Sequence, residues 1–348
     1  MGKVFVFTAP HTTGYQTYAD APLKADEVRI KTLYSGISAG TELTYYRGTN
    51  PYLSKRWDAD RKLFIAGDSA SISYPVTNLG YEEVGEIIEA GAGVDIPIGS
   101  RLFGTWGHRT HFVANLDYVR PRLMPEGADP LFGIFSHLGA IALNGVHDAD
   151  LKLGDTVAIF GMGALGQLVA LMARRSGAHV IAVDLHDSRL EMAKSLGAQV
   201  TLNARRDQPA EVIKALTNGL GADVCIEVSG STQALHEAIR AAAYSAHVVA
   251  MGFFQGEAHG LYLGDEFHHN RIALVCSQIS GVSPETSYRW NKMRLWQTAV
   301  RLQTDGWFDA RPLITHRAPF EQAGAFYQRL DEHPDDVLIA VLEFEESS

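Results

Sequence analysis

The stretch DTVAIFGMGALG, residues 155–166, decides the fold of much of this chain. An apolar run leads into Gly161, Gly163 and Gly166, and residues 164–176 are predicted to continue as a helix. A buried strand that passes through G-x-G-x-x-G into a helix is typical of a dinucleotide-binding unit. The first glycine permits the tight turn, the second lets the backbone approach a pyrophosphate, and the third allows close packing of helix and strand.

The acid that ends the next apolar run indicates the kind of cofactor. The run HVIAVD ends in Asp184, about 20 residues after the glycines. A carboxylate there accepts hydrogen bonds from both adenosine ribose hydroxyls and repels a 2′-phosphate, which favours NAD(H) over NADP(H). Arg189 could pair with a phosphate instead, although a solvated helix charge is the simpler interpretation. The expected cofactor contacts are Gly161, Gly163, Ala164, Leu165, Gly166, Asp184, Arg189, Ser229, Gly230, Met251 and Gly252.

The patterns on either side of this unit predict an α/β protein with two domains. From about residue 130, apolar strands alternate with helices, which indicates a parallel sheet covered on both faces. The first 125 residues or so contain short strands separated by Gly, Pro and Asn turns, a pattern typical of a compact β-barrel. We predict the barrel domain at 1–128, a doubly wound parallel-sheet domain at 129–272, and a return to the first domain at 273–348.

Composition and charge exclude several classes of protein. The chain has 348 residues and a formal net charge of −10, which argues against binding to nucleic acid or an anionic membrane, because both require basic patches. Thr156 to Ala173 is the longest uncharged run, but its glycines fit a strand, a turn and a helix better than a membrane span. No signal-peptide pattern opens the sequence, so we expect a cytoplasmic protein.

The two cysteines bear on redox compartment and on metal binding. Cys225 and Cys276 both lie in apolar runs and are predicted to be small buried side chains. Two cysteines exclude a disulfide framework and a four-cysteine zinc site.

Taken together, the motifs resemble those of the medium-chain dehydrogenase/reductase superfamily over nearly the whole chain. The matching segments are SGISAGTEL, GYEEVGEI, GSRLFG, the glycine turn, AVDLHDSRLEMAKSLGA, IEVSG and LITHRAPFEQA. The resemblance implies a GroES-like β-barrel domain for the substrate, an inserted Rossmann domain, and dimers or tetramers. The most similar subgroup resembles the bacteriochlorophyllide hydroxyethyl dehydrogenases, which share S-G-I-S-x-G-T-E and lack the zinc cysteines.

This sequence departs from the superfamily where zinc-dependent members hold their metal. The two positions filled there by Cys and His are Ser38 and Tyr81, and the third falls near Ser136 or His137. Neither Ser nor Tyr is a usual zinc ligand. We therefore expect no zinc, although a weak metal site at Glu82 and His137 is conceivable.

Without a metal, side chains must hold the substrate oxygen and move its proton. His137 is the first candidate acid/base, because imidazoles titrate near neutral pH, and its alternative is a packing role. Tyr81 could donate to a developing alkoxide or simply pack on a strand. By resemblance Thr41 would relay protons. Glu82 could orient Tyr81 or His137, or could instead satisfy backbone amides.

Aromatic and polar residues near these motifs predict a substrate pocket. Aromatic faces beside polar groups suit sugar or cyclitol rings, although loop packing explains the same residues. The expected pocket residues are Ser38, Tyr45, Trp57, Trp106 and His108.

The main functional prediction is an NAD(H)-dependent, zinc-independent alcohol dehydrogenase or ketone reductase. Its small-molecule substrate would be a secondary alcohol on a sugar, polyol or cyclitol. The alternatives are a dehydrogenase of a hydroxyethyl group on a chlorophyll-type macrocycle and a quinone or enone reductase. A different class is a non-catalytic dinucleotide-binding redox sensor, which would bind NADH without turnover.

Overall fold

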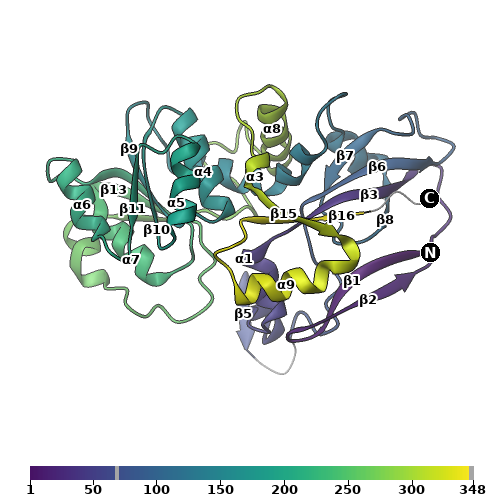
Figure 1. Cartoon of the computed structure of the whole chain (residues 1–348), viewed down its shortest axis with the longest axis horizontal. Helices are drawn as coiled ribbons and strands as arrows, with labels where there is room; N and C mark the ends of the chain where they lie inside the picture. Colours follow the sequence, from purple (N-terminus) through teal and green to yellow (C-terminus); the bar gives the residue numbers. More distant parts are fainter. Residues whose placement is uncertain (67–69, 345–348) are drawn as a thin grey trace. The chain divides into compact units, whose positions relative to one another are not determined.

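The computed structural model describes residues 1–66 and 70–344, and the chain divides into two compact units (Figure 1). Unit 1 comprises Met1–His137 and Val300–Ser348, and unit 2 comprises Leu138–Ala299. The domain boundaries drawn from the sequence, at 128/129 and 272/273, stay predictions beside these divisions. None of the helices in the described ranges combines the length and the apolar character that a bilayer crossing requires.

Unit 2 is built on a parallel sheet with strand order β11-β10-β9-β12-β13-β14. The order reverses between β9 and β12, as in a doubly wound fold, and confirms the predicted Rossmann-type sheet. The strands are β9 (Thr156–Phe160), β10 (His179–Asp184), β11 (Val200–Asn203), β12 (Ala222–Glu227), β13 (Ala242–Ala250) and β14 (Ala273–Cys276).

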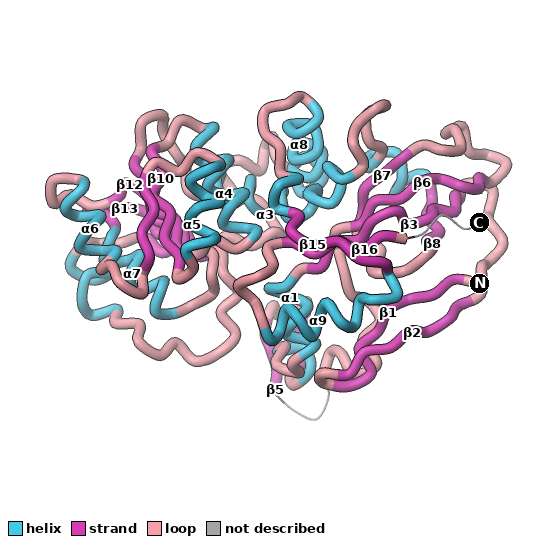
Figure 2. The backbone as a smooth tube through the Cα atoms, in the orientation of Figure 1, coloured by secondary structure: helices cyan, strands magenta, loops and turns pink. Residues whose placement is uncertain are grey.

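Helices cover both faces of this sheet, which explains why its central strands are apolar throughout. In Figure 2, α4 and α5 lie on one side of the strands, and α6 and α7 lie on the other. The helices are α4 (Ala164–Arg175), α5 (Asp187–Ser195), α6 (Pro209–Leu216) and α7 (Thr232–Ala241), with a single π turn at Leu263–Phe267. The core between strands and helices includes Phe160, Ile181, Ile213, Ile239 and Val248, all almost fully buried.

The prediction that both cysteines are buried is wrong for Cys276. Cys225 lies in the central strand β12 and is buried, whereas Cys276 is exposed. The reason is position in the sheet, because β14 is an edge strand whose residues alternate between partly buried and exposed.

Unit 1 is rich in antiparallel strands. Its main sheet has the order β15-β16-β3-β6-β7, with β8 paired to β3, and only β15 and β16 run parallel. The strands are β3 (Glu27–Ile37), β6 (Glu83–Ala90), β7 (Arg101–Gly104), β8 (His111–Asn115), β15 (Ile314–Pro319) and β16 (Ile339–Glu343). Because β16 pairs with β3, the C-terminal strand belongs to the sheet that the N-terminal region begins.

Two hairpins and several helices complete unit 1. The hairpins are β1 (Gly2–Ala9) with β2 (Thr12–Tyr18), and β4 (Lys55–Asp58) with β5 (Leu63–Ala66). The helices are α1 (Ala39–Tyr46), α2 (Leu116–Val119) and α9 (Ala323–Glu332), with 3₁₀ turns at Pro51–Leu53, Arg120–Arg122, Arg311–Leu313 and Phe320–Gln322. The helices α3 (Leu131–Asp148) and α8 (Lys292–Thr304) each run from one unit into the other.

Candidate active site

Three of the residues predicted to act on substrate meet in a chain of hydroxyl groups in unit 1. Ser38 ends the β3 segment and is the N-cap of α1, Thr41 lies in the first turn of α1, and Tyr81 comes just before β6. The Ser38 and Tyr81 hydroxyls share a hydrogen bond, and the Tyr81 hydroxyl donates to Thr41 Oγ1 at 3.3 Å. The sequence placed Ser38 only in the pocket, whereas the structure makes it part of this hydroxyl chain.

His137 lies against the same tyrosine. The ring centroids of His137 and Tyr81 are 4.6 Å apart with an interplanar angle of 49°, and the imidazole is 8% exposed. The imidazole and the hydroxyl chain are therefore neighbours, although His137 comes from α3, far along the chain.

Burial sets the protonation state of Tyr81. Loss of solvent raises the pKa of its phenol, and the neighbouring Glu82 carboxyl raises it further, while the bonds to Ser38 and Thr41 lower it less. The phenol is neutral at physiological pH. It can donate or accept a hydrogen bond to a substrate oxygen, but it is not a general base.

Glu82 is the unexpected member of this region. Its side chain is 1% exposed, and neither carboxyl oxygen has a hydrogen-bond partner among the described residues. Burial, followed by the charges of Glu42 and Glu83, raises the pKa of Glu82 well above its usual range and so favours its neutral form. No hydrogen bond to Tyr81, His137 or a backbone amide supports the orienting or amide-satisfying roles expected from the sequence.

A buried polar network that the sequence did not predict lies next to the hydroxyl chain. Glu42 Oε1 accepts the Ser38 amide at 2.8 Å, and Glu42 Oε2 lies 2.9 Å from His108 Nε2. The Tyr327 hydroxyl, from α9, lies 2.8 Å from the same imidazole nitrogen and also donates to Glu42. Nothing in the sequence pattern had singled out Glu42 or Tyr327.

The other side of His108 completes the network. His108 Nδ1 is 2.6 Å from the Ser35 hydroxyl, which donates to Glu83 Oε1 at 2.9 Å. Because that hydroxyl gives its proton to Glu83, it accepts from Nδ1, and both ring nitrogens are then donors. Burial alone would lower the pKa of His108, but Glu42 and Glu83 together outweigh it and the net pKa is raised. We therefore describe His108 as an imidazolium between two buried carboxyls.

Two of the predicted pocket residues are buried. His108 has no exposed surface, and Trp106 is 4% exposed, with its indole donating to Thr32 Oγ1 at 2.9 Å. Backbone hydrogen bonds join His108 to Leu79 and Phe5. Contact of either side chain with substrate stays a prediction.

The other two predicted pocket residues keep some exposed surface. Tyr45 is partly buried, and its carbonyl accepts the Tyr74 hydroxyl at 2.5 Å. Trp57 lies on the β4–β5 hairpin, is 37% exposed, and packs against Phe64 with ring centroids 4.9 Å apart. Their contact with substrate stays a prediction.

In unit 2 the glycine turn has the geometry that close approach of a phosphate requires. Gly161 has a φ of +98°, and a Cβ on Gly166 would lie 1.8 Å from the Gly161 carbonyl oxygen. A Cβ on Gly163 would meet nothing within 4 Å, so its outer side is open. Gly163 is also the N-cap of α4 and has no side chain to occupy the first amides of that helix. These features fit a pyrophosphate at the helix N-terminus.

Asp184 binds the turn itself. One carboxylate oxygen accepts the Met162 amide at 2.6 Å, and the other accepts the amides of Leu185 and His186 at 2.7 and 2.9 Å. A carboxylate has about four lone-pair sites, so three are used and about one is left for a ribose hydroxyl. The contact of Asp184 with the ribose hydroxyls stays a prediction.

The remaining predicted cofactor residues lie at the ends of strands or in the helix after β10. The buried Glu227 at the end of β12 accepts the amides of Ser229 and Gly230 at 2.7 and 3.1 Å. A Cβ on Gly252 would lie 2.2 Å from the Gly230 amide, so these two turns need glycine to pack together. Met251 is 9% exposed, and the Arg189 carbonyl accepts Gln167 Nε2 at 2.8 Å.

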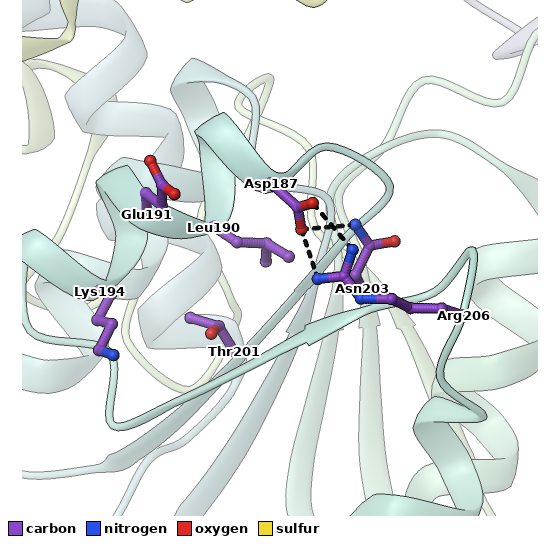
Figure 3. A pocket seen from close by; sticks show the side chains of 7 residues that line it. All are labelled: Asp187, Leu190, Glu191, Lys194, Thr201, Asn203 and Arg206. Carbon is purple, nitrogen blue, oxygen red and sulfur yellow. Dashed lines mark hydrogen bonds and ion pairs between the residues drawn. The ribbon is translucent and has the colours of Figure 1, made fainter.

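A cavity of about 350 Å³ opens between α5 and β11 (Figure 3). Asp187 forms a two-pronged ion pair with Arg206, at 2.7 and 2.9 Å, and accepts Asn203 Nδ2 at 2.8 Å. Asn203 pairs in register with Asp184, so this cavity lies near the strand end where the adenosine is expected. The ion pair neutralises a guanidinium that could otherwise attract a phosphate.

Comparisons with known proteins are consistent with this architecture. D-guloside 3-dehydrogenase of Escherichia coli (strain K12) is 32% identical over 342 residues, covering 96% of this chain and 97% of the relative. The chain belongs to the medium-chain dehydrogenase/reductase superfamily. Within it, the chain is one of the zinc-type alcohol dehydrogenase-like proteins and an oxidoreductase.

More distant members of the superfamily share the same architecture. (R,R)-butanediol dehydrogenase of Bacillus subtilis (strain 168) is 28% identical over 320 residues, covering 84% of this chain and 85% of the relative. The crystal structure of 2R,3R-butanediol dehydrogenase from Bacillus subtilis has a TM-score of 0.78 at 21% identity and covers 99% of both chains. This second likeness shows the fold.

The superfamily's metal does not fit the residues of this chain. A family model described as zinc-binding dehydrogenase matches residues 164–295, which do not include Ser38, Tyr81 or His137. At the positions that the resemblance assigns to metal ligands, the Ser38 and Tyr81 hydroxyls bond each other. Zinc requires thiolate, imidazole or ionised carboxylate ligands. Within residues 1–66 and 70–344, no three His, Cys, Asp or Glu side chains gather as a metal site would require.

Proposed function

We propose that this protein is an NAD(H)-dependent, zinc-independent dehydrogenase that interconverts a secondary alcohol and a ketone on a sugar, polyol or cyclitol. The observation that carries the proposal is the hydroxyl chain Ser38–Tyr81–Thr41 beside the His137 ring. It stands where zinc-dependent superfamily members would hold a metal. It supplies a different means of binding a substrate oxygen.

The substrate class rests on the whole-length relative. That relative is named for dehydrogenation of a D-guloside at position 3, and it matches this chain from end to end. A sugar ring offers a secondary alcohol flanked by further hydroxyls. The polar hydroxyls of Ser38 and Thr41 and the exposed Trp57 are suited to such a ring.

The cofactor proposal rests on unit 2. Gly161, Gly163 and the N-terminus of α4 would hold the pyrophosphate, and the Asp184 carboxylate would accept one ribose hydroxyl. A 2′-phosphate would meet the negative charge of Asp184, and the pairing of Arg206 with Asp187 offsets the nearby cation. A bound nicotinamide ring accepts a hydride from the carbinol carbon or returns one to it.

The residues of unit 1 would handle the hydroxyl proton. As the alcohol becomes a ketone, its O–H bond breaks and the proton must go to a side chain. Tyr81 is a neutral phenol with one proton, which it would turn from Thr41 Oγ1 to the substrate oxygen. His137 receives the proton, directly or through the Tyr81 hydroxyl, and returns it in the reductive direction. Ser38 and Thr41 fix the Tyr81 hydroxyl on either side.

A substrate panel tests the proposal. Purified protein is incubated with NAD and separate sugars, glycosides, polyols, cyclitols and aromatic alcohols, and reduced cofactor is followed by absorbance. Turnover with a sugar or polyol ring is expected. Turnover only with a hydroxyethyl macrocycle, or only of enones with NADPH, would refute the substrate class. Binding of NADH without any turnover would indicate a redox sensor instead.

Metal content and assembly are tested on the same sample. Elemental analysis should find far less than one zinc per chain, and activity should survive a chelator. A tightly held stoichiometric zinc would contradict zinc independence. A homodimer or homotetramer and a cytoplasmic location stay predictions, and light scattering of the purified protein checks the first.

A further inference from the structure

At the start of helix α1, the side chains of Ser38 and Glu42 form hydrogen bonds that differ from those of an ordinary helix N-terminus. Ser38 is the N-cap, and an N-cap serine normally accepts an amide of the first helical turn through its hydroxyl. Here the Ser38 hydroxyl caps nothing and bonds Tyr81 instead. Glu42 performs the capping alone, because its Oε1 accepts the Ser38 amide at 2.8 Å. In a capping box the acid that reaches back to the N-cap amide lies three residues after the N-cap, whereas Glu42 lies four residues after Ser38.

Glu42 is held firmly in this role. Its side chain is 2% exposed, and its second oxygen accepts from His108 Nε2 and the Tyr327 hydroxyl. Both partners have no exposed surface, and His108 is fixed in turn by Ser35 and Glu83. Glu42 therefore cannot turn away from the Ser38 amide without breaking buried hydrogen bonds, each of which is costly to leave unmade.

We infer that Glu42 is a positioning residue which, anchored by His108 and Tyr327, leaves the Ser38 hydroxyl free to pair with Tyr81. The inference rests on the proposed function, because Tyr81 is there assigned to hold the substrate oxygen. Without Glu42 the Ser38 amide loses its acceptor. The Ser38 hydroxyl would then turn toward the helix amides, as an N-cap serine normally does, and release Tyr81. The network thus links α9, through Tyr327, to the geometry of the hydroxyl chain.

A double-mutant cycle on kcat tests this link. Glu42→Ala and Ser38→Ala are made separately and together, and kcat and KM are measured with NAD and the best substrate. Glu42→Ala should lower kcat at least tenfold in the parent but less than twofold when Ser38 is already Ala, because there is no hydroxyl left to position. Glu42→Gln keeps an oxygen for the Ser38 amide, but its amide nitrogen cannot accept from His108 or Tyr327, so only part of the lost rate should return. An equal loss in both backgrounds would overturn the inference.

Two further variants separate positioning from general damage. Asn115→Ala removes the cap of α2 in the same unit, where Asn115 Oδ1 accepts the Tyr118 amide, and its effect should be independent of Ser38. Tyr327→Phe deletes only the hydroxyl that anchors Glu42 and should repeat the Glu42 pattern in a milder form. If Glu42→Ala does not fold, the same double-mutant cycle is made with Tyr327→Phe and Ser38→Ala, and its result tests the inference. Independence of Tyr327→Phe from Ser38 would overturn the inference.

A readout without turnover distinguishes this inference from the proposed function. Urea unfolding of Glu42→Ala, Tyr81→Phe and the double variant measures whether Glu42 supports the Ser38–Tyr81 bond. Tyr81→Phe should lower the unfolding midpoint in the parent and lower it much less beside Glu42→Ala. If the two substitutions are coupled in this way but the protein is inactive on every substrate, the proposed function is refuted and the positioning role of Glu42 is retained. Additive midpoints would refute the positioning even in an active enzyme.

Discussion

The hydroxyls of Ser38 and Tyr81 share a hydrogen bond, and the superfamily resemblance assigns these two positions to the Cys and His ligands of zinc-dependent members. Tyr81 has one proton, so it would donate to a substrate oxygen by giving up its bond to Thr41. The first prediction follows from this pair. Tyr81→Phe keeps the ring packed on His137 but removes the donor, so kcat should fall by about 10²-fold. NADH affinity, measured by fluorescence, should not change, because that site is built by unit 2.

His137→Ala removes the proposed proton acceptor. We expect a loss in kcat of about 10²-fold or more, together with a flattened pH–rate profile, because the titrating base is gone. His137→Gln is the matched control, since it keeps a polar side chain of similar length that cannot take up a proton. Unchanged rates in both variants would assign the base to another residue.

Two glycines of the cofactor turn should respond differently to the same added methyl group. In Gly166→Ala the new Cβ would lie 1.8 Å from the Gly161 carbonyl oxygen, so the protein should lose thermal stability. In Gly163→Ala the Cβ meets no protein atom within 4 Å, so stability should be kept while NADH binds more weakly. Calorimetric melting and NADH titration check both. Full NADH affinity in Gly163→Ala would refute the placement of the pyrophosphate.

Asp184→Asn should lessen the preference for NADH over NADPH. The change removes the negative charge that disfavours a 2′-phosphate, yet keeps one oxygen for the backbone amides. Adding Asp187→Ala should strengthen NADPH binding further, because Arg206 is then released from its ion pair. Dissociation constants for both cofactors are the measurement. Equal affinities for NADH and NADPH in the parent would contradict the NAD assignment.

The pKa of Glu83 should make stability depend on pH. Burial raises that pKa from 4.5 to about 7, and His108, the Gly107 backbone and Ser35 lower it less. A carboxyl whose folded pKa lies above its unfolded pKa binds more protons in the folded state, so its contribution is lost as pH rises from about 4.5 through 7. Glu83→Gln resembles the protonated form. The free energy of unfolding of the Glu83→Gln variant, measured relative to that of the parent, should therefore increase by up to about 3 kcal/mol between pH 5 and pH 8. A pH-independent difference in urea unfolding would contradict the raised pKa.

The two cysteines should differ in reactivity. Iodoacetamide should modify the exposed Cys276 in the native protein, while the buried Cys225, whose pKa is raised by burial, should react only after unfolding. Mass spectrometry of tryptic peptides checks this. Protection of Cys276 in the native state would indicate that another chain covers the β14 edge.

The sequence by itself determined the parts of the fold that depend on local pattern. The run from Thr156 through Gly166 predicted strand, turn and helix. A buried parallel strand and a glycine turn can each be recognised from a short stretch of sequence, because neighbouring residues alone determine them. Apolar strands alternating with helices predicted the doubly wound sheet for the same reason. The candidates Tyr81, Thr41 and His137 came from the superfamily resemblance, and the structure places them together.

Only the tertiary structure decided which polar groups are buried and what they bind. Glu42, His108 and Tyr327 are separated by up to 285 positions in the chain, and no local period links them. Their protonation states depend on loss of solvent and on each other's charge, which exist only after packing. For the same reason the burial of His108 and Trp106 could not be foreseen, and Cys276 was assigned to a core that it does not enter. Local sequence fixes the backbone pattern, whereas burial is a property of the whole fold.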